Sequence, residues 1–216
     1  MARIVFDLDG TLIDSAPDIQ GIANRILQAE GRDPIDLATT HKFIGNGTKV
    51  FIDRMIAARD LDEADHDRLH AAFLAHYDDA VDLTHPYPGV VAALDALARD
   101  HALGLCTNKP IKPTRHVVDH LGWNDRFGVV YGGDSFAVKK PDPAPLHAAF
   151  AALGDGPCLY VGDSEVDAET ADRAGVPFLL FTEGYRRGPV ADMPHSIAFD
   201  DWRALPDFVA RVLAPA

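Results

Sequence analysis

Two aspartates, Asp7 and Asp9, end an apolar run near the start of the chain, in the stretch RIVFDLDGTLIDS (residues 3–15). A buried carboxylate is unfavourable unless it is paired with a cation or bound to a metal. Asp9 and Gly10 would also make a good turn by themselves. The two-residue spacing allows both carboxylates to face the same side of an extended chain. The pair therefore predicts either a turn or a site that requires two negative charges.

Similar polar side chains follow other apolar runs further along the chain. They are Thr107 and Asn108 after one run, Asp163, Ser164 and Asp167 after another, and Lys140 in the proline-rich loop KKPDPAP. Each of these residues alone would be read as a helix cap or a surface residue. Together they place three carboxylates, a hydroxyl and a lysine at the ends of predicted strands, which independent caps and turns do not require.

This set of side chains suits phosphoryl transfer. Asp7 and Asp163 would offer Mg²⁺ hard oxygen ligands, and a free oxygen of Asp7 could attack phosphorus to form an aspartyl-phosphate. Asp9 could protonate the leaving oxygen and then take a proton from the attacking water. Thr107 and Lys140 would hold the phosphoryl oxygens and offset their charge. Gly10 would let the backbone approach the phosphate closely.

The elements that must position these residues alternate between strand and helix. Strands are predicted over residues 3–8, 102–108, 127–133, 158–163 and 176–182, and helices over 88–100, 114–123, 143–154, 164–175 and 202–213. This alternation predicts an α/β fold, a Rossmann-like parallel sheet with helices on both faces. Ligands of such sheets bind beyond the carboxyl ends of the strands, where the polar residues fall.

Residues 16–86 have a different pattern, which is helical throughout. Pro86 and Pro88 break that pattern at its end. The sequence therefore predicts an all-helical domain, residues 16–86, inserted into a catalytic core formed by residues 1–15 and 87–216.

Composition excludes several classes of function. The 216 residues carry a formal net charge of −13, are 47% hydrophobic and 25% charged, and have few clustered basic residues. A nucleic-acid partner and an anionic membrane surface are therefore not expected. Cys106 and Cys158 form no disulfide framework, and no signal peptide is evident, so a cytoplasmic location is expected.

The motifs DLDGT, TN, KKPDPAP and GDSEVDAETA, in this order, resemble the four signature motifs of haloacid dehalogenase-like phosphatases. The resemblance implies that Asp7 is the nucleophile and Asp9 the general acid/base, with Mg²⁺ held by Asp7, Asp163 and the main-chain carbonyl of Asp9. Thr107 and Lys140 would bind phosphate. Further residues are implied to support these groups: Gly10, Ser164 and Asp167. The helical insert would be a mobile cap.

Longer segments resemble the phosphoglycolate phosphatases of this family, among them IGNGTKVFIDRMI, CTNKP and GYRRG. The resemblance implies that the substrate is 2-phosphoglycolate, a small phosphorylated metabolite. The glycine loop Gly45–Asn46–Gly47 would close over it, although these residues also suit a plain turn. The substrate's carboxylate would meet Lys49, Arg186 or the amides of that loop. The other expected substrate-binding residues are Thr11 and Asn108.

Alternatives remain open from the sequence. A phosphatase for another ester such as a sugar phosphate, or a phosphomutase of the same family, would share every core motif. A non-catalytic binding module on the same fold would have no need of Asp9. We expect hinges near residues 13–15 and 87–88, and a monomer or a homodimer.

Overall fold

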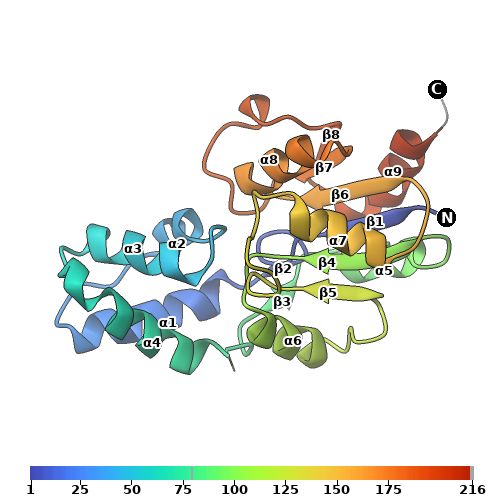
Figure 1. Cartoon of the computed structure of the whole chain (residues 1–216). Coiled ribbons are helices and arrows are strands. Elements are labelled where there is room, and N and C mark those ends of the chain that lie inside the picture. Colours follow the sequence, from blue (N-terminus) through green and yellow to red (C-terminus); the bar gives the residue numbers. More distant parts are fainter. Residues whose placement is uncertain (79, 215–216) are drawn as a thin grey trace.

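The computed structural model describes residues 1–78 and 80–214, and a six-stranded parallel sheet forms its centre (Figure 1). The strand order is β5 (Val129–Tyr131), β4 (Ala102–Cys106), β1 (Arg3–Phe6), β6 (Cys158–Gly162), β7 (Phe178–Phe181) and β8 (Ile197–Phe199). All neighbouring pairs are parallel. The predicted Rossmann-like α/β fold is confirmed.

Helices cover both faces of the sheet because its central strands are apolar on both sides. Ile4 and Phe6 of β1 belong to a cluster with α5 (Val90–Leu97), α6 (Ile111–His120) and α9 (Leu205–Leu213). Val5, between them, belongs to a second cluster on the opposite face, which includes side chains of α7 (Ala144–Ala152) and α8 (Glu165–Ala174). Alternate residues of one strand thus fix the two helical layers.

The segment between β2 (Ile13–Asp14) and β3 (His85–Pro86) contains four α-helices with an apolar cluster of their own. They are α1 (Ala16–Ala29), α2 (Leu37–Phe43), α3 (Thr48–Ala58) and α4 (His66–Tyr77). Figure 1 shows these helices beside the edge of the sheet toward which β1 runs. Short 3₁₀ helices occur at Glu63–Asp65, Val190–Asp192 and Trp202–Ala204.

Two details differ from the sequence-based expectation. His85–Pro86 was placed in the helical segment, but it pairs antiparallel with Ile13–Asp14. The two chain crossings, where the chain leaves the core and returns to it, therefore lie side by side. Strand β8 was not predicted, because three residues give too short a hydrophobic pattern. Both elements acquire their hydrogen bonds from distant parts of the chain.

Two further findings concern the described residues. Cys106 and Cys158 are free cysteines. Within residues 1–78 and 80–214, no helix has the length and apolar character that crossing a membrane requires.

Candidate active site

Asp7 lies directly after β1, in a buried ion network with Lys140. The Lys140 ammonium is 2.9 Å from Asp7 Oδ1 and 2.6 Å from Asp167 Oδ1, and it donates to the Tyr160 hydroxyl at 2.8 Å. The Tyr160 hydroxyl donates in turn to Asp167 Oδ1 at 2.7 Å. Lys140 is therefore held beside Asp7 by Tyr160 of β6 and Asp167 of α8.

Asp163 follows β6 and is held from the first and last parts of the chain. Thr11 Oγ1 donates to Asp163 Oδ1 at 2.7 Å, and the Tyr185 amide donates to Asp163 Oδ2 at 2.6 Å. Gly10 has a φ of 84°, and a Cβ there would lie 2.5 Å from Asp163 Oδ2. Glycine is required at this turn because the backbone passes so close to the carboxylate.

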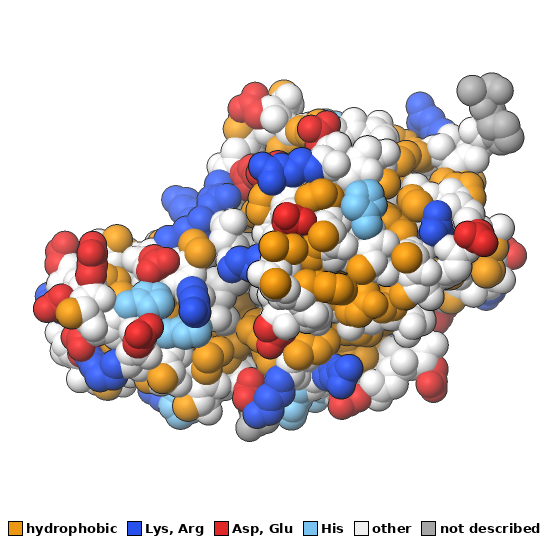
Figure 2. Space-filling view, in the orientation of Figure 1, with side chains coloured by type: hydrophobic (Ala, Val, Ile, Leu, Met, Phe, Trp, Pro, Cys, Tyr) orange, Lys and Arg blue, Asp and Glu red, His pale blue; other side chains and the backbone are white. Residues whose placement is uncertain are grey.

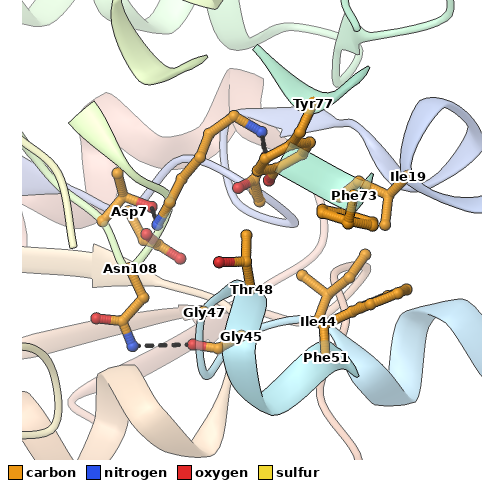
Figure 3. A pocket seen from close by; sticks show the side chains of 13 residues that line it. Asp7, Ile19, Ile44, Gly45, Gly47, Thr48, Phe51, Phe73, Tyr77 and Asn108 are labelled. Atoms are coloured by element: carbon orange, nitrogen blue, oxygen red, sulfur yellow. Dashed lines mark hydrogen bonds and ion pairs between the residues drawn. The ribbon is translucent and has the colours of Figure 1, made fainter. Parts of the chain in front are cut away.

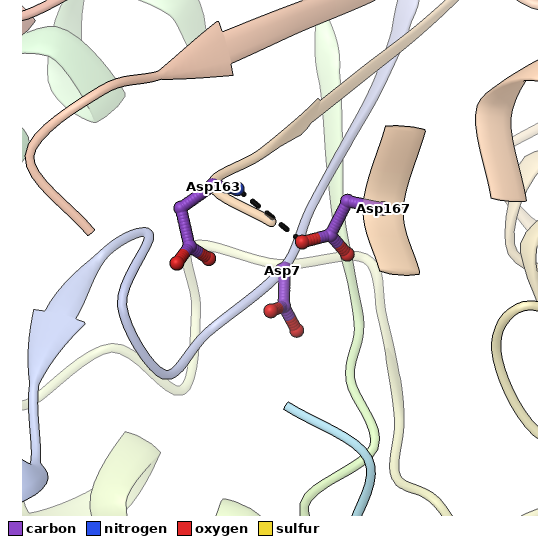
Figure 4. A group of neighbouring side chains, drawn as sticks. All are labelled: Asp7, Asp163 and Asp167. Carbon is purple, nitrogen blue, oxygen red and sulfur yellow. Dashed lines mark hydrogen bonds between the residues drawn. The ribbon is translucent and has the colours of Figure 1, made fainter. Parts of the chain in front are cut away.

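Three carboxylates converge here, as Figure 4 shows for Asp7, Asp163 and Asp167, and each offers an oxygen within 4.8 Å of the others. Burial raises the pKa of Asp7 to about 6, although the Lys140 ammonium opposes the shift. Burial and the charges of Asp167 and Asp7 also raise the pKa of Asp163. Burial alone would also raise the pKa of Asp167, but the Lys140 ammonium and hydrogen bonds from Lys140, Ser164 and Tyr160 outweigh burial and lower that pKa. Positive charge is therefore in deficit beside Asp7 and Asp163.

Asp9 is held by a second buried cation. Ser15 Oγ donates to Asp9 Oδ1 at 2.6 Å, and the Lys109 ammonium donates to the same oxygen at 3.2 Å. Lys109 also donates to the hydroxyl of Tyr77, at the end of α4, at 2.8 Å. Asp9 is thus tied both to the chain crossing at Ser15 and, through Lys109, to the helical segment.

The glycine loop meets the core at Asn108 and Lys139. Asn108 Nδ2 donates to the carbonyl oxygen of Gly45 and to that of Lys140, each at 3.0 Å, and Lys139 Nζ donates to the carbonyl oxygen of Asn46 at 2.7 Å. Gly45 and Gly47 have φ values of 109° and 87°, which favour glycine. Figure 2 shows basic side chains on both sides of this junction.

A small cavity lies between the sheet edge and the helices. Figure 3 shows Asp7 and Asn108 on one side, with Thr48, Phe73 and Tyr77 of the helical segment opposite. Its lining residues are Asp7, Asp9, Ile19, Ile44, Gly45, Gly47, Thr48, Phe51, Phe73, Tyr77, Thr107, Asn108 and Lys109. Its volume is about 40 Å³. This arrangement places Asp7 and Asp9 between the core and the helical segment.

The structure brings the predicted core residues together. Asp7, Asp9 and Thr107 line this cavity, and Asp163 and Ser164 line a smaller hollow that also contains Asp7 and Asp9. Lys140 lies behind Asp7, at 2.9 Å. The hydroxyl of Thr107 accepts a hydrogen bond from the Lys109 amide at 3.2 Å.

Other predicted substrate-binding residues lie elsewhere or have different partners. Thr11 is fully buried and its hydroxyl positions Asp163, and Asn108 uses its amide group on two backbone carbonyls. The Asn46 side chain accepts from Arg54 at 2.8 Å. Lys49 is exposed and lines a separate hollow that does not contain Asp7. Arg186 is absent from the lining of both cavities around Asp7. Proximity therefore does not support Lys49 or Arg186 as substrate contacts.

Three residues of this region were not singled out from the sequence. Lys109 contacts Asp9, and Arg187 lines the hollow beside Asp163. The Tyr185 hydroxyl accepts from the amides of Ser15 and Ala16 and donates to the carboxylate of Asp14, so this residue connects Asp163 to the chain crossing. Lys109 directly follows the predicted TN motif, so its position at the end of a strand could have identified it as a site residue from the sequence.

Comparisons with known proteins give one family. Residues 4–181 match the profile described as haloacid dehalogenase-like hydrolase. A Cereibacter sphaeroides protein named phosphoglycolate phosphatase is 49% identical, covering 99% of this chain and 100% of the relative, and one of the same name from Rhodobacter capsulatus is 40% identical, covering 95% of each. The crystal structure of a predicted phosphoglycolate phosphatase from Haemophilus somnus superposes with a TM-score of 0.88, at 30% identity, over 95% of this chain and 96% of that one.

Proposed function

Since the chain belongs to the haloacid dehalogenase-like hydrolase family, we propose that it is a Mg²⁺-dependent phosphoric monoester hydrolase that converts 2-phosphoglycolate to glycolate and phosphate. The observation that carries this proposal is the position of Asp7, beside Lys140 and Asp163 at the carboxyl ends of the strands. Full-length similarity to proteins named phosphoglycolate phosphatase supports the choice of substrate.

The acidic cluster fits a divalent cation. Asp7 and Asp163 offer hard oxygen ligands, and burial disfavours their charged forms without further positive charge. Asp167 is already saturated by Lys140, Tyr160 and Ser164, so it suits a supporting position better than a ligand position. We assign Mg²⁺ to Asp7, Asp163 and the main-chain carbonyl of Asp9. When bound, the ion supplies positive charge against the phosphoryl oxygens.

The residues of the chain divide the reaction between them. An Asp7 carboxylate oxygen bonds to phosphorus while the ester bond breaks, and Asp9 gives its proton to the leaving glycolate oxygen. Water then attacks the phosphorus of the aspartyl-phosphate and loses a proton to Asp9, which releases phosphate and regenerates Asp7. Thr107 and Lys140 hold the non-bridging oxygens, and Lys140 offsets the charge that develops on them.

The helical segment is proposed to act as a mobile cap, residues 16–86, on a core of residues 1–15 and 87–216. An open position of the segment would admit the substrate to the cavity beside Asp7, and a closed one would exclude water from it. The hinge lies at the paired crossings Ile13–Asp14 and His85–Pro86, close to the expected hinges at residues 13–15 and 87–88. Structures with and without a phosphate mimic test this. An unchanged position of α1–α4 in both would reject the hinge.

A panel of phosphate esters with Mg²⁺ tests the function. We expect the highest kcat/KM for 2-phosphoglycolate, and loss of phosphate release in Asp7→Asn. Equal or higher kcat/KM for sugar phosphates would reject the substrate but keep the phosphatase. Transfer of phosphate to a second sugar position would instead indicate a phosphomutase, and a rate unaffected by Asp7→Asn would indicate a binding module. A cytoplasmic monomer or homodimer is also proposed, and size-exclusion chromatography tests the oligomeric state.

A further inference from the structure

The cavity beside Asp7 has one cationic group in its lining. Among the described residues that line it, Lys109 is the only lysine or arginine. The lining from the helical segment consists of the apolar side chains of Ile19, Ile44, Phe51 and Phe73, the hydroxyls of Thr48 and Tyr77, and the backbone of Gly45 and Gly47. A substrate that carries a second negative charge beyond its phosphate needs a positively charged or hydrogen-bonding partner in this largely buried space.

The Lys109 ammonium is buried but retains capacity for another partner. Its side chain is 2% exposed, and two of its three N–H donors serve Asp9 and Tyr77. The buried contact with the Asp9 carboxylate favours the charged ammonium, and its third N–H can donate one further hydrogen bond.

The Lys109 backbone lies beside the Thr107 hydroxyl, and Asp9 and Tyr77 hold its ammonium. Thr107 and Lys109 lie on one three-residue segment after β4, and the Lys109 amide donates to Thr107 Oγ1 at 3.2 Å. The reacting carboxylates and Lys109 line the same small cavity. A short leaving group on a phosphate held near Asp7 and Thr107 would bring its far end to the Lys109 side of that cavity.

We infer that Lys109 binds the carboxylate of the substrate and thereby selects phosphate esters of short hydroxy acids. This inference rests on the proposed function. Lys109 replaces Lys49 and Arg186 in that role, because neither of them lines the cavities around Asp7. Arg187 is the competing cation. It lines the hollow beside Asp163, where its Nε is 3.6 Å from Glu165 Oε2.

The test compares 2-phosphoglycolate with isobutyl phosphate, in which two methyl groups replace the carboxylate oxygens. The ratio of their kcat/KM values is measured for the wild type, Lys109→Met and Arg187→Met. Loss of a hydrogen bond between charged groups predicts that the ratio falls about 10- to 100-fold in Lys109→Met. It should stay within about 3-fold in Arg187→Met, since a cation outside the subsite contributes little.

A binding measurement separates recognition from chemistry. Calorimetry compares 3-phosphonopropionate with propylphosphonate, which lacks the carboxylate. We expect Lys109→Met to lower the affinity for 3-phosphonopropionate about 10- to 100-fold more than the affinity for propylphosphonate. Because Lys109→Met leaves Asp9 without its cation, the comparison is repeated on an Asp9→Asn background, where no buried carboxylate at this position loses its partner.

The outcomes are distinguishable. A wild type that does not prefer 2-phosphoglycolate would reject the proposed function, and this inference with it. A wild-type preference that survives in Lys109→Met, or that is lost in Arg187→Met instead, would overturn the inference alone.

Discussion

Asp167 gives the sharpest test of how the site is held together. Its carboxylate accepts hydrogen bonds from Lys140, Tyr160, the Ser164 hydroxyl and the amides of Ser164 and Asp163, and it is fully buried. Asp167→Asn replaces one acceptor oxygen by an NH₂ group, which must face donors in either orientation of the amide. The substitution therefore removes charge and creates donor–donor contacts together.

The magnitude follows from what remains around Lys140. Breaking a buried ion pair costs about 3–5 kcal/mol, largely because the partner is left unpaired. Lys140 keeps Asp7 at 2.9 Å, so we expect the lower end, about 3 kcal/mol. For a chain of this size that corresponds to a decrease in Tm of about 6–12 °C.

The assay is thermal unfolding in EDTA at pH 7. The matched control is Asp172→Asn, the same substitution at an exposed position of the same helix. We expect it to lower Tm by less than about 2 °C. If the two variants melt within 2 °C of each other, the buried network around Asp167 does not stabilise the protein as described. The pKa of Asp167 is lowered on folding, so its contribution in the wild type is present above its unfolded value of 3.8 and is lost as pH falls through the lower folded value.

Three further predictions concern the metal, the helical segment and the first turn. In the absence of metal, Asp7 has a folded pKa of about 6 against an unfolded value of 3.8, so its contribution to stability falls as pH rises from about 4 to 6. Mg²⁺ binds the ionised carboxylate and should therefore raise Tm more at pH 7 than at pH 5. An equal increase in Tm at both pH values would contradict the proposed metal site. Lys139→Met removes the contact between the core and the Asn46 carbonyl of the glycine loop, and it should raise KM about 2- to 10-fold with kcat little changed. The control Lys49→Met should leave KM unaltered. Equal KM values for the two variants in steady-state kinetics would exclude a role of Lys139 in closing the glycine loop over the site. Gly10→Ala puts a Cβ against the carboxylate of Asp163, a proposed Mg²⁺ ligand. It should weaken Mg²⁺ binding by calorimetry at least 10-fold, about 1.4 kcal/mol. Unchanged affinity would show that the turn can move aside.

The fold followed from the sequence where the signal was local and long. Alternating apolar runs predicted the parallel sheet, because strands covered on both faces read as continuous hydrophobic stretches. Strand β8 and the pairing of Ile13–Asp14 with His85–Pro86 could not be predicted, since two or three residues carry no periodic pattern. Their pairing depends on segments far away in the chain.

Residue type and order identified Asp7, Asp9, Thr107, Lys140 and Asp163 as a set, because carboxylates, a hydroxyl and a lysine at the carboxyl ends of parallel strands meet at one edge. The tertiary structure alone decided the partners of each group. It showed that Thr11 positions Asp163, and that Lys109 rather than Lys49 enters the cavity.

The physical reason why the sequence predicted the fold but not the partners of each group is the distance in sequence over which the interactions act. Strand and helix patterns arise from neighbours in sequence, and they determined the layers and the edge where chemistry occurs. The choice among surface and buried cations depends on a few ångströms of side-chain reach and on the loss of water around each charge. Those quantities exist only once β4, α4 and the first turn of the chain have packed together.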